Sequence, residues 1–292
     1  MNHGGYQWAI LILSNMKLMN PIFIGSFRSG TTALVNLLGL HEEITPWFET
    51  KGLCEPLRWL RVLANPRLQE AELELTRPVE IRGFGTHQVA DRIRDDIKQT
   101  ASRISGAIVS GKGDHEHYPI GNDYVLYSLE SGLAAVDIWE EEVSSLQNLE
   151  TIQNATGKLI LSLSEHHLRK SGKSICINKT PEITRFGSEL SDCLGPCKTI
   201  FVLRNGKEVV ISAKLLDWGE KKLLAHWWKT LIRESRAHGV QNKDSYLEIL
   251  YEDYVNNPEK EADRALEFIG LKYCGNELVS RYRNILANKH QI

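Results

Sequence analysis

The sequence predicts an α/β protein with a P-loop-like central parallel sheet flanked by helices. Two observations lead to this fold class. First, short apolar runs typical of buried strands alternate with segments of helical periodicity. Second, the run at residues 21–25 stops at a glycine turn that opens directly into a helix. Strands joined by helices pair in parallel, and ligands of such sheets bind beyond the carboxyl ends of the strands.

The individual elements follow from these patterns in chain order. The strands are predicted at residues 21–25, 174–178, 198–203 and 246–250. Helices are predicted between and after them, at residues 31–40, 182–193, 207–216, 221–238 and 258–269. Residues 52–170 carry few strand signals and hold helical patterns instead, at 89–104 and 124–149. We therefore predict a single domain over residues 1–292, with a helical insertion at about residues 52–170 that forms a cap.

The composition excludes several classes of protein. The 292 residues are 42% hydrophobic and 25% charged, as in an ordinary globular chain. The 35 basic and 37 acidic residues give a net charge of -2, so no global basic field for nucleic acid is present. No apolar run approaches the roughly 20 residues that span a bilayer. The five cysteines are scattered and form no zinc or disulfide pattern, so we expect reduced thiols in a cytoplasmic protein.

A candidate anion site follows the first strand, in the segment Gly25-Ser26-Phe27-Arg28-Ser29-Gly30-Thr31-Thr32. Amides of a glycine turn and of a helix N-terminus together form a cradle for phosphate. The glycine spacing is that of the nucleotide-triphosphatase loop, but Thr31 stands where that loop has Lys. The cation lies inside the loop instead, at Arg28, and Ser29, Thr31 and Thr32 add hydroxyl donors. A Ser/Thr-capped glycine turn is the simpler alternative, but the strand, the helix and Arg28 favour the anion site.

Three motifs identify a family resemblance. Residues 23–32 resemble the 5′-phosphosulfate loop of sulfotransferases that use 3′-phosphoadenosine 5′-phosphosulfate (PAPS). Residues 202–212 are similar to the family's 3′-phosphate segment, in which Arg204 ends a strand and Ser212 follows on the next helix. Residues 250–271 resemble a late segment of the same family, in which Tyr251 lines the adenine pocket. The pattern is most similar to tyrosylprotein sulfotransferases and related bacterial enzymes, and it covers roughly residues 21–51 and 174–271.

The resemblance implies an activity and a set of site residues. The activity is in-line transfer of a sulfuryl group from PAPS to an acceptor hydroxyl, without a metal, which leaves 3′-phosphoadenosine 5′-phosphate (PAP). The implied catalytic residues are Arg28, Lys179 in an Asn-Lys-x-Pro segment, and Glu49, which would be the general base. The implied donor-binding residues are Arg28, Ser29, Gly30, Thr31, Thr32, Lys51, Arg204, Ser212 and Tyr251.

Several alternatives stay open. Glu55 or a histidine could replace Glu49 as the base, although we interpret His41 as structural. The His115–His117 segment with Asp114 is weak as a metal site and is typical of a solvated loop. Two other functions compete with sulfuryl transfer, namely an ATP-dependent kinase on a related P-loop fold and a non-catalytic nucleotide-binding module. The acceptor could be a small molecule, a glycan or a tyrosine.

Overall fold

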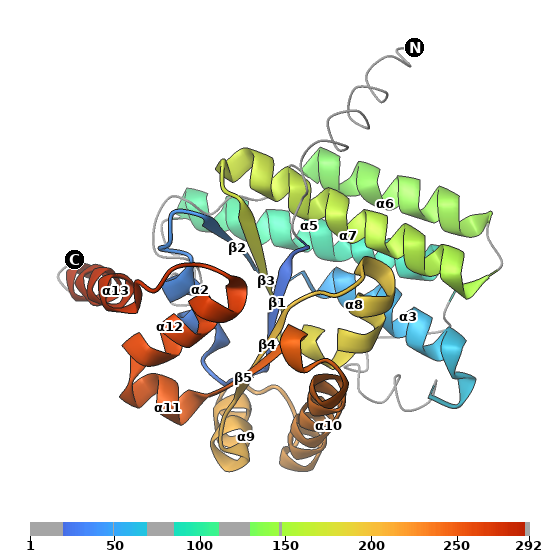
Figure 1. Ribbon diagram of the computed structural model, residues 1–292. Helices are drawn as coiled ribbons and strands as arrows, with labels where there is room; N and C mark the ends of the chain where they lie inside the picture. The colour runs from blue at the N-terminus through green and yellow to red at the C-terminus, as the bar shows by residue number, and fades with distance from the viewer. Residues whose placement is uncertain (1–19, 49, 69–84, 111–128, 146–147, 290–292) are drawn as a thin grey trace.

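The chain folds around a five-stranded parallel sheet, which confirms the predicted fold class. The computed structural model describes residues 20–48, 50–68, 85–110, 129–145 and 148–289. The strand order is β2-β3-β1-β4-β5, so β1 lies at the centre of the sheet (Figure 1). The strands are β1 (Ile22–Gly25), β2 (Ile44–Phe48), β3 (Ile175–Lys179), β4 (Thr199–Leu203) and β5 (Tyr246–Leu250).

The strand that sequence reasoning missed is β2, at one edge of the sheet. It contains Pro46, which has no N–H to donate and therefore argues against a central strand. An edge strand tolerates proline because only one of its sides is paired. Pro46 lies opposite Ile177 of β3 in the register.

Helices cover both faces of the sheet. Their bounds in the described part of the chain are α2 (Thr31–Leu38), α3 (Cys54–Ala64), α5 (Thr86–Ser110), α6 (Leu129–Ser144), α7 (Leu149–Ser171), α8 (Gly187–Leu194), α9 (Gly206–Leu215), α10 (Lys221–Gln241), α11 (Tyr251–Asn256), α12 (Pro258–Ile269) and α13 (Gly275–Lys289). Short 3-10 turns are η1 (Lys51–Leu53), η2 (Pro66–Leu68), η3 (Ile183–Phe186) and η4 (Lys243–Ser245).

Two predicted helices differ from the observed ones. The pattern at 182–193 begins with the 3-10 turn η3 and becomes α-helical only at Gly187. The pattern at 124–149 is not one helix, because α6 ends at Ser144 and α7 begins at Leu149. Asn148 caps α7, since its side chain accepts a hydrogen bond from the Thr151 amide.

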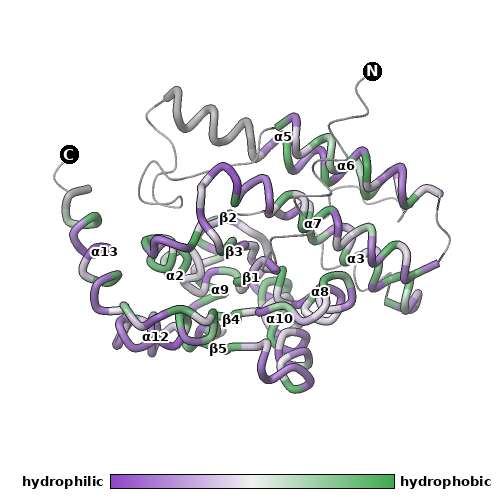
Figure 2. The backbone as a smooth tube through the Cα atoms, turned by 45° about the horizontal axis from the view of Figure 1, so that its top comes forward, coloured by the Kyte–Doolittle hydropathy of each residue, from purple (hydrophilic) through white to green (hydrophobic). Residues whose placement is uncertain are grey.

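Alternate side chains of the strands enter separate cores, as the pleat requires. On one face, the side chains of Ile22 and Ile24 join a cluster with α2, α12 and α13. On the other face, Phe23 packs into a cluster with α3, α5, α6, α7 and α8, and Phe201 packs with α9 and α10. Figure 2 shows hydrophobic and hydrophilic residues alternating along α7 and α12, as expected for helices with one buried face.

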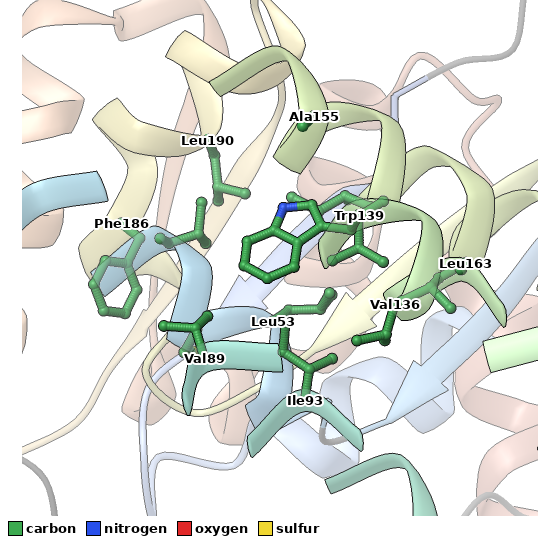
Figure 3. Packing of buried hydrophobic residues seen from close by; sticks show 14 of the residues in the cluster. Leu53, Val89, Ile93, Val136, Trp139, Ala155, Leu163, Phe186 and Leu190 are labelled. Atoms are coloured by element: carbon green, nitrogen blue, oxygen red, sulfur yellow. The ribbon is translucent and has the colours of Figure 1, made fainter. Parts of the chain in front are cut away.

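The described helices of residues 52–170 pack against one another and against one face of the sheet in a single hydrophobic cluster. Trp139 of α6 lies among side chains from α5, α7, η1, η3 and α8 (Figure 3). Its indole N–H donates to the Thr156 hydroxyl of α7 at 3.2 Å, which satisfies the polar atom of a residue only 1% exposed. The helical cap of the fold class is thus present, whereas the division into one domain with an insertion stays a prediction. Within the described residues, no helix is long and apolar enough to cross a membrane.

A buried histidine covers the outer strand. The Nε2 atom of His167 in α7 donates to the Pro46 carbonyl at 2.6 Å, and its ring stacks on Trp47. The contact satisfies a carbonyl of the edge strand, which would otherwise invite pairing with another chain. Burial lowers the pKa of His167 to about 4 from its usual 6.5.

This histidine predicts how stability depends on pH. Between about pH 6.5 and pH 4 the unfolded chain binds a proton on this imidazole that the folded protein does not bind. The free energy of unfolding should therefore fall by on the order of 3 kcal/mol as the pH drops through this window. Above about pH 6.5 the stabilisation is fully present, because His167 is then neutral in both the folded and the unfolded chain. Urea titrations at several pH values would measure the slope. His167→Gln should reduce the slope and the matched variant His226→Gln on the exposed face of α10 should not; equal slopes in all three proteins would contradict this account.

Candidate functional site

Each strand ends in a segment that carries a predicted site residue. Because all pairings are parallel, the five carboxyl ends lie at the same edge of the sheet. Lys179 is the last residue of β3, and the segments that follow β1, β2, β4 and β5 contain Arg28, Lys51, Arg204 and Tyr251, respectively. The sheet therefore gathers at one edge residues that are far apart in the sequence.

The loop after β1 has the backbone of an anion cradle. Three of its residues have positive φ angles: Ser26 at 132°, Arg28 at 53° and Gly30 at 80°. Alternating backbone conformations of this kind turn successive N–H groups toward one concave side, where they can bind an anion. Gly30 is also the N-cap of α2, whose first turn adds the free amides of a helix N-terminus.

The hydroxyl groups of the loop hold its shape. Ser26 donates to Ser29 at 2.9 Å, Ser29 donates to the Phe27 carbonyl at 3.1 Å, and Thr31 donates to the Ser26 carbonyl at 3.2 Å. Ser29 and Thr31 are buried, whereas Thr32 is half-buried. The hydroxyl protons of Ser29 and Thr31 thus serve loop carbonyls, so their backbone N–H groups are the better candidates for contact with an anion.

The side chain of Arg28 extends from the loop to α9. Its Nε donates to the Ser212 hydroxyl at 2.9 Å, and its carbonyl accepts from the Nη1 of Arg204 at 3.1 Å. The guanidinium lies 5.6 Å from the centre of the Trp218 ring. Arg28 is therefore hydrogen-bonded to both Arg204 and Ser212, which are predicted to bind the other end of the same nucleotide.

Tyr251 connects the last strand to this cluster. The Arg204 guanidinium lies 4.5 Å from the centre of the Tyr251 ring. The ring also packs so closely on Gly30 that a Cβ there would lie 2.6 Å from its Cδ2 and Cε2 atoms. The contact explains why glycine is required at this position, in addition to its positive φ.

Lys179 ends β3 between two neighbouring strands, paired with Ile24 and Phe48. It is only 2% exposed, and its Nζ lies 5.5 Å from the centre of the Phe48 ring. A lysine buried at a strand end is unusual unless other groups stabilise its charge, and an aromatic face is one such group.

A closed ring of hydrogen bonds joins the ends of β2 and β3. Asn178 donates to the Thr50 hydroxyl at 2.6 Å, the Thr50 amide donates to the Thr180 hydroxyl at 3.1 Å, and Thr180 donates back to Asn178 at 3.1 Å. All three residues are buried. The ring fixes the chain immediately before Lys51, which is exposed at the start of η1. Glu49 lies outside the described residues.

The 3-10 turn η3, which follows β3, packs against the loop after β1. The Pro181 carbonyl just before it accepts the Ser26 amide at 2.8 Å. Thr184 packs against Gly25, where a Cβ would lie 2.6 Å from the Thr184 hydroxyl. Arg185 is tied to Glu234 of α10 at 2.7 Å. Although burial raises the pKa of Glu234, the guanidinium groups of Arg185 and Arg61 hold it below its usual range.

The two alternative base residues, Glu55 and His41, lie in different parts of the structure. Both carboxylate oxygens of Glu55 accept from guanidinium groups, of Arg58 at 2.5 Å and of Arg92 at 3.0 Å. Glu55 is therefore engaged in two ion pairs. His41 precedes β2 at the amino end of the sheet, opposite the site, and its Nδ1 accepts from the Glu43 amide.

No site for a metal is found in the part of the chain that the structure describes: no three His, Cys, Asp or Glu side chains are grouped to hold an ion. Asp114 and the segment 115–117 lie outside that part. A cavity of about 540 Å³ lies at the amino end of the sheet, between the α2–β2 turn and the α12–α13 connection. Its lining includes His41 and Arg281 and none of the residues proposed for the donor site.

Two features of the site were missed by sequence reasoning. The Asn178–Thr50–Thr180 ring had a signal, because Asn178 and Thr180 flank Lys179 in the motif that singled it out. Trp218 had none, because it lies in the connection between α9 and α10 and reaches Arg28 only through the fold.

The profile of the sulfotransferase family matches residues 21–274. Since the match spans most of the chain, the protein belongs to the sulfotransferase family and is a transferase. Among proteins of curated function, none matches this sequence.

Two solved structures, STF9 and STF1, share the fold of this chain at low sequence identity. Sulfotransferase STF9 from Mycobacterium avium is 14% identical, with a TM-score of 0.50 over 97% of this chain and 71% of its own. Sulfotransferase STF1 from Mycobacterium tuberculosis H37Rv is 14% identical, with a TM-score of 0.50 over 94% and 74%. The sulfotransferase domain of the Synechococcus PCC 7002 olefin synthase is 18% identical, with a TM-score of 0.49 over 89% and 76%.

The close packing of Tyr251 on Gly30 predicts a large cost for Gly30→Ala. The matched control is Gly172→Ala, because Gly172 also has a positive φ, of 67°, but a Cβ added there would meet no atom within 4 Å. The control should cost about 1 kcal/mol from the left-handed backbone alone. Gly30→Ala should cost about 1–3 kcal/mol more, as overpacking does. Chemical unfolding would measure both values, and equal losses would show that the Tyr251 ring moves aside freely.

Proposed function

We propose that the protein transfers a sulfuryl group from PAPS to an acceptor hydroxyl. The observation that carries this proposal is the contact of Arg28 with both Arg204 and Ser212, at the edge where all five strands end. Family membership supplies the class of reaction, and the donor set at this edge supports the choice of donor. Each half of a bisphosphorylated nucleotide requires its own anion site, and the residues present fit both.

The proposed donor site has two parts. The backbone amides of the loop and of the α2 N-terminus, with Arg28 and Lys51, would hold the 5′-phosphosulfate. Arg204 and Ser212 would hold the 3′-phosphate, because a guanidinium binds phosphate as a fork and a hydroxyl adds one donor. Tyr251, already stacked on Arg204, would contact the adenine.

The proposed catalytic groups act through charge and proton transfer. The bound donor supplies an activated sulfuryl group. Arg28 would stabilise negative charge on the phosphate, and Lys179, held rigidly at the end of β3, would stabilise charge on the transferring oxygens. Glu49, which precedes the tightly held Thr50, would accept the proton of the acceptor hydroxyl. We propose no metal in this reaction, since the two cations and the loop amides serve as electrostatic stabilisers.

The proposal extends to partners and location. The acceptor carries a hydroxyl group, on a small molecule, a glycan or a tyrosine, and neither nucleic acid nor a membrane span takes part. The five scattered cysteines, with no disulfide pattern, favour a cytoplasmic protein with reduced thiols.

Nucleotide specificity is the first test. Calorimetry should show that PAP binds without metal, and that ADP and ATP with magnesium bind far more weakly. A preference for ATP with magnesium would favour the kinase alternative, and no binding of any of the three would leave a fold without this donor site. Arg204→Ala should weaken PAP binding by about 1.5–3 kcal/mol through loss of a charged phosphate contact, whereas an unchanged affinity would remove Arg204 from the site.

The general base is tested by Glu49→Gln. PAP binding should be unchanged, while transfer of radioactive sulfate from PAPS to a tyrosine peptide, a simple phenol or a long-chain alcohol should slow by on the order of a hundredfold. Glu55→Gln is the matched control, because it neutralises a nearby carboxylate that is engaged in two ion pairs. Retention of transfer in the Glu49 variant and its loss in the Glu55 variant would reverse the assignment.

A further inference from the structure

We propose that Trp218 is a positioning residue that holds the guanidinium of Arg28 in place for the 5′-phosphate end of the donor. The inference rests on the proposed function, because it gives Arg28 the role assigned to it there. Trp218 is half-buried and lies in the short connection between α9 and α10. These two helices stand side by side in Figure 1.

The indole covers two consecutive residues of the phosphate loop. The Arg28 Cζ lies 5.6 Å from the centre of the Trp218 ring, within the range of a cation–π interaction. The ring of Phe27 lies 6.5 Å from that of Trp218, at an interplanar angle of 38°. Trp218 thus packs on Arg28, a non-glycine residue of the loop whose φ angle of 53° is left-handed.

An aromatic face suits this task for a chemical reason. A carbonyl or carboxylate would hold a guanidinium by accepting its N–H groups, in competition with a phosphate. An indole attracts the face of the guanidinium through its quadrupole, whereas hydrogen bonds to oxygen form in the guanidinium plane. Trp218 can therefore orient Arg28 without occupying the donors that bind an anion.

The connection is shaped so that the indole turns toward the loop. The residues on both sides of Trp218 have positive φ angles, Asp217 at 54° and Gly219 at 139°. The Trp218 amide donates to the Ala213 carbonyl of α9 at 3.2 Å, which ties this turn to the helix that carries Ser212. Positive φ at a non-glycine residue persists only where the surroundings enforce it.

The test compares two nucleotides that differ at the end assigned to Arg28. PAP carries phosphate at both ends, whereas adenosine 3′-phosphate lacks the 5′-phosphate. Calorimetry on Trp218→Leu should show PAP binding weakened by roughly 3- to 30-fold, with adenosine 3′-phosphate unchanged within about twofold. Trp218→Phe, which keeps an aromatic face, should recover much of the PAP affinity. In an Arg28→Ala background, Trp218→Leu should have no further effect.

Three results would overturn the inference. Trp218→Leu could weaken the binding of both nucleotides equally, or Trp218→Phe could bind PAP no better than Trp218→Leu. In the Arg28→Ala background, Trp218→Leu could still weaken PAP binding as much as it does in the wild-type protein. Thermal unfolding of each variant shows whether it is folded, and the Phe variant retains the test if Leu is not tolerated. Failure of the wild-type protein to bind PAP would overturn the proposed function itself, and that result is read before any variant is made.

Discussion

Parallel pairing of β1 with both β3 and β4 is the constraint on which the rest of the structure depends. A parallel sheet places all carboxyl ends at one edge, and a central first strand places its loop in the middle of that edge. The loop containing Arg28 is therefore flanked by Lys179 on one side and Arg204 on the other. The two hydrophobic faces of the sheet are covered by separate groups of helices, so the edge itself is the part of the sheet left to bind ligands.

Neutral polar and aromatic groups contact the cations at this edge, and Arg204 also lies 3.8 Å from the Glu208 carboxylate. The ring of Asn178, Thr50 and Thr180 fixes the ends of two strands through hydrogen bonds between uncharged side chains and one amide. Aromatic faces lie on Lys179, Arg28 and Arg204. These polar and aromatic contacts hold the cationic side chains in place.

A group of ion pairs beneath the site has a structural role. Arg61 and Arg185 share Glu234, and the three residues join α3, η3 and α10. Their attachment holds η3, which in turn supports the phosphate loop through Pro181 and Thr184. Breaking a buried pair of this kind is costly because one charge is left uncompensated. The rigidity of the loop thus depends on charges that do not themselves face the site.

The sequence by itself determined which segments of the chain form four of the strands, the helices between them and the loop after β1, since these features depend on local chemistry. Glycine spacing, apolar runs and the Arg28 motif are read within a few residues of one another, so the four predicted strands and the loop were found. Tertiary structure decided the rest. Strand β2 was hidden by Pro46, whose tolerance depends on its edge position. Likewise, the contact of Trp218 with Arg28 depends on how α9 returns to the first loop, because residues so distant in sequence meet only through the packing of the whole sheet.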